Sequence, residues 1–332
     1  MTVLRCVRGL RLAMAAMVVL PLIVLASSGG HPGRGATGTV AQRLVSFSGR
    51  PCFGAAALDR HASCPAPTTM PSPAKAAHDW SAAYRVQSNG RDCWSRIPRF
   101  RRSTCHFGDK HAHTKVVLVG NSHAGEWLPA LQRIARRKHW RIVTELASQC
   151  AMSDVNQVFP TRRSSVHCRS WVRRTTARVR KERPDLIVFV NRMSVPAHGH
   201  RFAHSAPVYA AGMRRVFRHW KGIPVVLIRD TPVPGGSGIS VPSCLMAHPD
   251  DYAACNGRRS AWVPAEPGRA AAKHFGNVHV VNLNDHICGP KICSAVVGGV
   301  IPYFDGSHLS ATYSRTLAPY LMPHLVSALR RG

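Results

Sequence analysis

Between residues 116 and 330, short apolar runs alternate with longer segments that carry apolar residues at helical spacing. The runs are rich in β-branched residues and unbroken by polar ones, as in strands buried on both faces of a parallel sheet. This pattern predicts strands over residues 116–120, 141–147, 186–190, 225–229 and 278–282. It predicts helices over about 125–138, 168–182, 207–220 and 310–330. Repeated strand–helix units imply an α/β fold with three α/β/α layers and a central parallel sheet of about five strands.

The N-terminus carries the pattern of an export signal. Arg5, Arg8 and Arg11 precede an uncharged, mainly apolar run over residues 12–26, as in the charged and apolar regions of a secretory signal. The run is shorter than the roughly 20 residues that span a bilayer comfortably. Small residues follow it, but they form no clean cleavage site. Residues 1–28 are therefore a signal peptide or a membrane anchor, and both interpretations stay open.

Two further boundaries follow from composition. Residues 29–78 are rich in Gly, Pro and Ser and predict a linker that includes a small Cys-bounded loop. Residues 79–332 hold the alternating pattern and predict one folded domain.

Cysteine usage agrees with export. Of eleven cysteines, Cys6 lies in the signal-like segment, which leaves an even number for the rest of the chain. These predict disulfides in an oxidising compartment, and the absence of any CxxC pair argues against a metal site. Sequence does not fix their connectivity, but we expect pairing between nearest neighbours: Cys52/Cys64, Cys93/Cys105, Cys150/Cys168, Cys244/Cys255 and Cys288/Cys293. The chain is thus expected to be extracytoplasmic, either secreted or anchored by its N-terminal segment.

The charge is strongly basic. The chain has 45 Lys and Arg against 15 Asp and Glu, a formal net charge of +30. Such a surface attracts polyanions, which suggests an anionic wall polymer or a lipid surface as a partner. A solvated surface from an Arg-rich proteome is the alternative. There is no zinc-finger spacing, aromatic RNA-binding signature or zipper, so no specific nucleic-acid partner is expected.

Polar residues stand where the predicted strands end. Ser122, Ser148, Asn191 and Asp230 follow the first four strands. Such strand ends converge on one edge of a parallel sheet, where ligands bind. Ser122 lies at a strand-to-helix turn, where free N–H groups favour negative charge, and it is a candidate nucleophile. Its alternative role is to cap the helix.

Asp305 and His308 lie three residues apart, just before the last predicted helix. A hydroxyl nucleophile needs a base within reach, and the base needs a group that fixes its tautomer. At this spacing the carboxylate can orient the imidazole, and a backbone carbonyl group is the alternative partner. An Asp-x-x-His pair is common by chance, so the prediction rests on its position together with Ser122.

Two motifs resemble blocks I and V of the SGNH hydrolase superfamily: Gly120-Asn121-Ser122-His123-Ala124 and Asp305-Gly306-Ser307-His308-Leu309-Ser310. Further motifs make the chain most similar to the extracytoplasmic SGNH domain of acyltransferase-3 (O-acetyltransferase) proteins. These motifs are residues 51–58, residues 230–234, residues 242–245 with Cys255, and Cys288 with Cys293. The resemblance covers about residues 45–330. It implies the flavodoxin-like SGNH form of the three-layer fold, with residues 79–332 as the catalytic domain.

Carried over by position, the resemblance implies that Ser122 is the nucleophile, His308 the base and Asp305 its orienting carboxylate. It implies oxyanion donors from the Ser122 backbone and from Asn191. The block III pattern Gly-x-Asn-Asp is missing, so Asn191 is assigned to block III only by its position after the third strand. That Asn191 merely caps the end of the strand is an equally good interpretation. Asn121 replaces the usual Asp of block I, and no block II glycine follows the second strand.

His123 and Asp230 are weaker candidates for substrate binding. The alternatives are that His123 only begins the helix and that Asp230 belongs to a Pro-rich exit from the strand. No metal or cofactor is expected. The resemblance implies transfer of an O-acyl group, above all acetyl, to a cell-envelope glycan. Because the chain lacks a multi-span acyltransferase part, a separate membrane protein is the expected acyl donor. Two alternatives remain: an O-acetyl esterase that uses the same site, and a non-catalytic envelope module that binds polyanions.

Overall fold

Strand β3 (Lys115–Gly120) shows how the apolar runs build the core. Val116 and Leu118 belong to one apolar core, whereas Val117 and Val119 belong to another. Successive side chains of a strand point to opposite faces, so a strand that is apolar throughout is buried from both sides. The continuous apolar run in the sequence therefore follows directly from a sheet with a helical layer on each face.

The computed structural model describes residues 50–60, 62–65, 71–87 and 90–332. The predicted signal or anchor over residues 1–28 and the linker over 29–49 lie outside the described residues. Within the described part, no helix combines the length and the apolar character needed to cross a bilayer.

The main sheet has the order β1-β4-β3-β5-β6-β8, and β2 pairs antiparallel with β4. Its strands besides β3 are β1 (Trp94–Ser95), β2 (His106–Gly108), β4 (Arg141–Ala147), β5 (Leu186–Val190), β6 (Val225–Ile228) and β8 (Val278–Val281). The five longer parallel strands, numbered along the chain, stand in the order 2-1-3-4-5, which is the flavodoxin-like arrangement. The predicted fold class is confirmed, and β3 and β5 flank the point where the strand order reverses.

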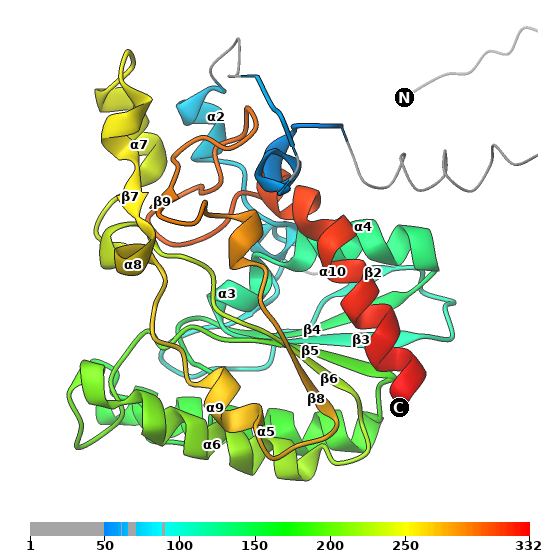
Figure 1. The fold of residues 1–332 in the computed structure, drawn as a ribbon. Coiled ribbons are helices and arrows are strands. Elements are labelled where there is room, and N and C mark those ends of the chain that lie inside the picture. The colour runs from blue at the N-terminus through cyan, green and yellow to red at the C-terminus, as the bar shows by residue number, and fades with distance from the viewer. Residues whose placement is uncertain (1–49, 61, 66–70, 88–89) are drawn as a thin grey trace, which may run out of the picture.

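Helices cover both faces of the sheet (Figure 1). On one face lie α4 (Leu128–Lys138) and α10 (Ala311–Arg331). On the other lie α5 (Arg162–Glu182), α6 (Ala206–His219) and α9 (Gly268–Ala272). The predicted helix over 125–138 is in fact divided into α3 (Ser122–Gly125) and α4, which has a proline in its first turn. Helix α5 begins earlier than predicted, at a Thr161 cap that accepts from the Ser164 N–H.

The connections after β6 and β8 form a lobe of short elements above the sheet in Figure 1. In this lobe lie η4 (Pro234–Ser237), α7 (Val241–Ala247), η5 (Tyr252–Cys255), β7 (Gly257–Arg258), α8 (Arg259–Trp262), η6 (Asn284–His286) and β9 (Ile292–Cys293). The other short elements of the described residues are η1 (Gly54–Leu58), α2 (Pro73–Ala76) and η2 (Ala82–Tyr84), which precede β1, and η3 (Phe202–His204), which follows β5.

The Cys-bounded loop that the composition assigns to the linker packs against α10. The Ala55 N–H donates to Thr316 Oγ1 at 3.0 Å, and the Tyr320 hydroxyl donates to Asp59 at 2.7 Å. Ala55 is fully buried in this contact. This part of the linker therefore lies against the body of the domain.

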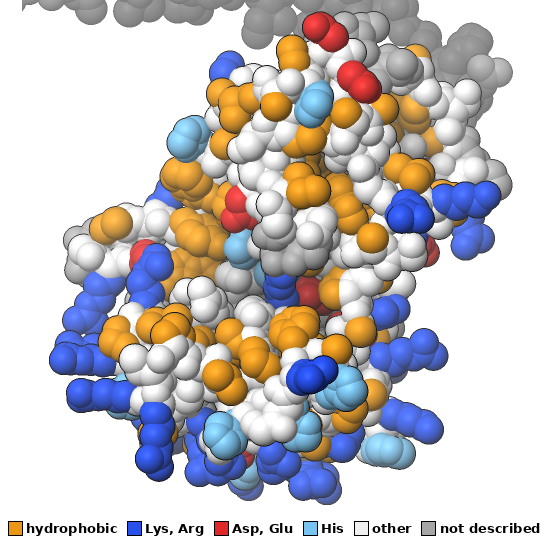
Figure 2. Space-filling view, turned by 90° about the vertical axis from the view of Figure 1, so that its left-hand side faces the viewer, with side chains coloured by type: hydrophobic (Ala, Val, Ile, Leu, Met, Phe, Trp, Pro, Cys, Tyr) orange, Lys and Arg blue, Asp and Glu red, His pale blue; other side chains and the backbone are white. Residues whose placement is uncertain are grey.

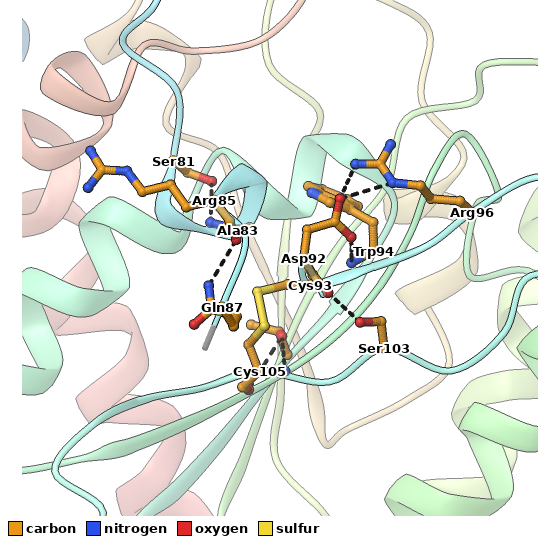
Figure 3. Close-up of a disulfide and its surroundings, with 11 residues drawn as sticks. Ser81, Ala83, Arg85, Gln87, Asp92, Cys93, Trp94, Arg96, Ser103 and Cys105 are labelled. Carbon is orange, nitrogen blue, oxygen red and sulfur yellow. Dashed lines mark hydrogen bonds and ion pairs between the residues drawn. A yellow bond between two sulfur atoms is a disulfide. The ribbon is translucent and has the colours of Figure 1, made fainter. Parts of the chain in front are cut away.

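Five disulfides join the cysteines of the described residues, each to its nearest neighbour in sequence: Cys52–Cys64, Cys93–Cys105, Cys150–Cys168, Cys244–Cys255 and Cys288–Cys293. Figure 3 shows Cys93–Cys105, which fastens the segment before β3 to the sheet. There the Thr144 N–H of β4 donates to the Cys105 carbonyl oxygen at 3.0 Å. Disulfides in this number support an extracytoplasmic location.

Gly120 gives the first testable prediction. A Cβ at this position would lie 1.7 Å from the Val190 carbonyl oxygen of β5, and the φ angle is +150°. We expect Gly120→Ala to lower the free energy of unfolding by about 3 kcal/mol, because β3 and β5 must move apart and the backbone is strained. Urea unfolding measures this loss. Gly276→Ala, where space is open, is the matched control and should stay within about 0.5 kcal/mol of wild type. Equal losses in both variants would contradict the prediction.

Candidate active site

Ser122 lies in the serine turn (residues 120–123), where β3 ends and α3 begins. The Asn121 side chain fixes this turn. Its Nδ2 donates to the Arg192 carbonyl oxygen at 2.7 Å, and its Oδ1 accepts from the Arg192 N–H at 3.1 Å. A carboxylate can only accept, so the amide at position 121 makes a pair of bonds that an Asp could not. This Asn121 clamp holds the serine turn against the loop after β5.

Asp305 and His308 lie in a closed loop before α10. Asp305 Oδ1 accepts from the N–H groups of Ser307 and His308, both at 2.8 Å, and its Oδ2 lies 2.8 Å from His308 Nδ1. Burial alone would raise the pKa of Asp305, but the hydrogen bond and the attraction of His308 outweigh it and hold that pKa below its usual value. The ionised carboxylate keeps the imidazole proton on Nδ1, so Nε2 is the basic nitrogen.

His308 packs beside the serine turn. Its ring centroid lies 5.0 Å from that of His123, the residue after Ser122. Its Nε2 is buried and has no hydrogen-bond partner among the described residues. No hydrogen bond joins Ser122 to His308 within the described residues, and such bonds often tighten only when substrate binds. The geometry thus presents a basic nitrogen without a partner beside the serine turn, at the carboxyl edge of the sheet.

Aromatic rings hold the plane of His308. Phe304 stacks on it with 5.4 Å between centroids and 11° between planes. Tyr84 packs edge-on against Phe304 at 5.8 Å and lies 4.9 Å from Trp94. The Trp94 indole in turn covers Gly125 of α3, where a Cβ would come within 2.4 Å of the ring. Trp94 follows the Cys93–Cys105 disulfide directly, as Figure 3 shows.

His123 and Asp230, predicted as weak substrate contacts, are buried and bind each other. His123 Nδ1 lies 2.6 Å from Asp230 Oδ1, and His123 Nε2 lies 3.4 Å from Arg192 Nη1. A guanidinium only donates, so Nε2 carries no proton and Nδ1 donates to Asp230. Burial lowers the pKa of His123 although Asp230 opposes this, so the neutral imidazole is favoured. The pair forms a line from Asp230 through His123 to Arg192.

Glu126 connects three loops of the site from inside the protein. It is 1 % exposed. Its Oε1 lies 2.8 Å from the Thr231 hydroxyl, and its Oε2 accepts from the Leu309 N–H at 2.9 Å. Burial raises the pKa of Glu126 well above its usual value, and the nearby Asp230 and Asp305 add to this. Glu126 therefore positions the residue next to His308 while favouring its own neutral form.

Asn191 follows β5 and is almost fully buried. Its Oδ1 accepts from the Met152 N–H at 2.7 Å. Because the atom that accepts this bond must be the amide oxygen, the other atom of the amide is Nδ2. Nδ2 has no hydrogen-bond partner among the described residues. A buried amide donor without a partner is costly, and at a strand end beside a serine it is a candidate for binding a developing oxyanion.

The structure brings Ser122, Asn191, His308 and Asp305 to one edge of the sheet, as the strand ends predict. Figure 2 faces this edge and shows a recess between the helical layer and the upper lobe, where acidic, basic and histidine side chains gather. Sequence reasoning missed Glu126 and Arg192. Ser148, which follows β4, makes no side-chain hydrogen bond to these residues within the described part of the chain. No group of three or more potential metal ligands occurs among the described residues.

Comparisons with known proteins identify the family and agree with the fold. A family model described as the SGNH domain (fused to AT3 domains) matches residues 89–323. None of the curated proteins is similar enough in sequence to match. Among solved structures, the periplasmic domain of a lipopolysaccharide acetyltransferase from Salmonella ser. Paratyphi A has a TM-score of 0.51 and 12 % identity. The match covers 65 % of this chain and 85 % of that chain, and at this identity it shows a shared fold alone.

Glu126 gives a prediction for pH dependence. Because its pKa is raised on folding from an ordinary value of 4.5, the unfolded chain loses this proton first. Glu126 therefore contributes fully to the free energy of unfolding below pH 4.5. This contribution is lost as pH rises through the raised pKa. Glu126→Gln mimics the neutral carboxyl and should flatten this decline in melting temperature above pH 4.5. Glu126→Ala should instead cost about 2–3 kcal/mol, because the Leu309 N–H loses its partner.

Thermal unfolding across a pH series measures both effects. Glu182→Gln, which changes a half-buried carboxylate outside the recess, is the matched control and should keep the wild-type slope. An unchanged slope in Glu126→Gln would show that Glu126 is ionised in the folded protein.

Proposed function

This chain belongs to the family of SGNH domains fused to AT3 domains, and from that premise we propose that it is a serine-dependent O-acyltransferase that acts outside the cytoplasm on a cell-envelope glycan. Family membership supports an acyl-transfer or esterase role. The observation that carries the proposal is the Asp305–His308 pair, which leaves a buried, unpartnered Nε2 beside the serine turn.

In the first half-reaction, Ser122 Oγ attacks the acyl carbonyl carbon while His308 Nε2 takes the hydroxyl proton. Asp305 accepts from Nδ1–H and stabilises the imidazolium that forms. When the tetrahedral intermediate collapses, the bond to the leaving group breaks and His308 returns the proton to that group. The acyl group is then held as an ester on Ser122.

In the second half-reaction, a sugar hydroxyl attacks this ester and gives its proton to His308 Nε2. Collapse breaks the Ser122 ester bond, and the proton passes from His308 to Ser122 Oγ. The products are an O-acyl sugar and free enzyme. If water attacks in place of the sugar hydroxyl, the same steps hydrolyse the ester and the protein acts as an esterase. The acceptor that fits the recess therefore decides between transfer and hydrolysis.

Two donors are available for the oxyanion in both steps. The Ser122 N–H lies at the start of α3, where the helix supplies no acceptor for it. Asn191 Nδ2 is oriented by the Met152 contact and lacks a partner within the described residues. Fixed donors in a buried site stabilise developing charge more than mobile water does.

The acetyl group is the acyl group that we propose, with a membrane protein as its donor. We further propose that residues 1–28 direct export or anchor the chain at the membrane. An anchor would hold the site close to such a donor and to the envelope glycan.

Ser122→Ala and His308→Ala give a direct test. Each should lower kcat for release of p-nitrophenol from p-nitrophenyl acetate by at least about 10³-fold, because each removes a member of one catalytic unit. Transfer to a glycan acceptor, followed by mass spectrometry, should fall in parallel. Ser170→Ala on α5 is the matched control. Turnover in Ser122→Ala equal to wild type would refute the catalytic role and favour a polyanion-binding module.

Asn191→Asp separates an oxyanion donor from a strand-end cap. The carboxylate can still accept from the Met152 N–H, but it cannot donate to an oxyanion. We expect kcat to fall by about 10²–10³-fold in protein that is folded at the assay temperature, although the buried carboxylate lowers the melting temperature. Asn282→Asp is the matched control, because Asn282 Oδ1 accepts from a backbone N–H in the same way at an exposed position. Wild-type kcat in Asn191→Asp would assign Asn191 to capping alone.

A further inference from the structure

Arg192 is a cation in the recess without an acidic partner. Within the described residues it forms no ion pair, and its side chain makes one polar contact, the 3.4 Å approach of Nη1 to His123 Nε2. It is half-buried. A guanidinium offers five N–H donors in a rigid fork, so most of its donors are unused.

The position of Arg192 is nevertheless fixed from two sides. The Asn121 clamp binds its N–H and its carbonyl oxygen. The buried His123 presents an unprotonated Nε2 to the guanidinium, and Asp230 holds His123 in that tautomer. A flexible surface arginine has neither constraint. These contacts orient the guanidinium toward the serine turn.

The carboxyl groups nearby are already engaged. Asp230 binds His123, Asp305 binds His308, and Glu126 binds Thr231 and the Leu309 N–H. A half-buried guanidinium that the protein leaves unneutralised favours an anion from outside, and it binds carboxylate or phosphate oxygens through two parallel hydrogen bonds. Arginine and lysine side chains also surround this face of the molecule (Figure 2), which would attract an anionic polymer.

We propose that Arg192 binds an anionic group of the acceptor, so that the acceptor is an acidic glycan carrying carboxylate or phosphate close to the hydroxyl that is acylated. This inference rests on the proposed function and names the substrate class of the same site. Arg192 is a specificity residue in this proposal. His123 and Asp230 are positioning residues, since they act through Arg192.

The test compares acceptors with and without an anionic group. With p-nitrophenyl acetate as acyl donor and the full chain as enzyme, kcat/KM for acetyl transfer is measured for oligogalacturonate and for its methyl ester. A second pair, glucose 6-phosphate and glucose, tests phosphate. We expect wild type to prefer the charged member of at least one pair by about 10-fold or more, and the preferred pair identifies carboxylate or phosphate as the ligand.

In Arg192→Gln the preference should fall about 10-fold, chiefly through a higher KM for the charged acceptor. Arg192→Lys should recover part of it, since the charge remains and the fork is lost. Arg180→Gln is the matched control: Arg180 is exposed in the last turn of α5, which leads to the opposite edge of the sheet. It removes one positive charge there and should keep the wild-type preference.

Two results would overturn this inference: a wild-type ratio near one for both pairs, or an unchanged ratio in Arg192→Gln. Either can occur while wild type still acetylates sugars or releases p-nitrophenol. Failure of the proposed function is different, because wild type would then turn over no ester or would match Ser122→Ala.

Discussion

The two hydrogen bonds between the Asn121 side chain and the Arg192 backbone join the loops on which the whole site depends. These loops leave β3 and β5, the strands that flank the reversal of strand order. Gly120 allows the backbones to approach closely enough for these bonds to form. One amide thereby sets the relative positions of Ser122, Asn191 and Arg192. Block I of the SGNH superfamily usually has Asp here, and the exchange for Asn suits this backbone because the amide both donates and accepts.

Around this clamp, buried polar groups are arranged so that acids and bases have separate tasks. Asp305 stays ionised because N–H groups and His308 surround it, whereas Glu126 favours its neutral form because it is buried among other carboxyls. His123 stays neutral and serves as an acceptor. Similar side chains thus differ in protonation because their surroundings differ, which leaves His308 as the base and Arg192 as the cation without an acidic partner in the described recess.

The fold was predictable because parallel strands buried on both faces leave long apolar runs, and β4 and β5 have the predicted bounds. The serine and the Asp-x-x-His pair were predictable because strand ends converge and motifs mark them. The two-residue β1 leaves no periodic signal. Glu126 and Arg192 were missed for another reason: a charged residue is normally on the surface, and nothing local in the sequence indicates that tertiary packing encloses Glu126 or selects one arginine among 45 basic residues.

The Cys150–Cys168 disulfide affects the proposed active site as well as the loop that it closes. Both sulfurs are buried, and the bridge ties the segment after β4 to α5. That segment supplies the Met152 N–H that orients the Asn191 amide. The orientation of a proposed catalytic donor therefore depends on a covalent bond that a reducing cytoplasm does not sustain. The bridge thereby links the redox state of the surroundings to the geometry of the proposed donor.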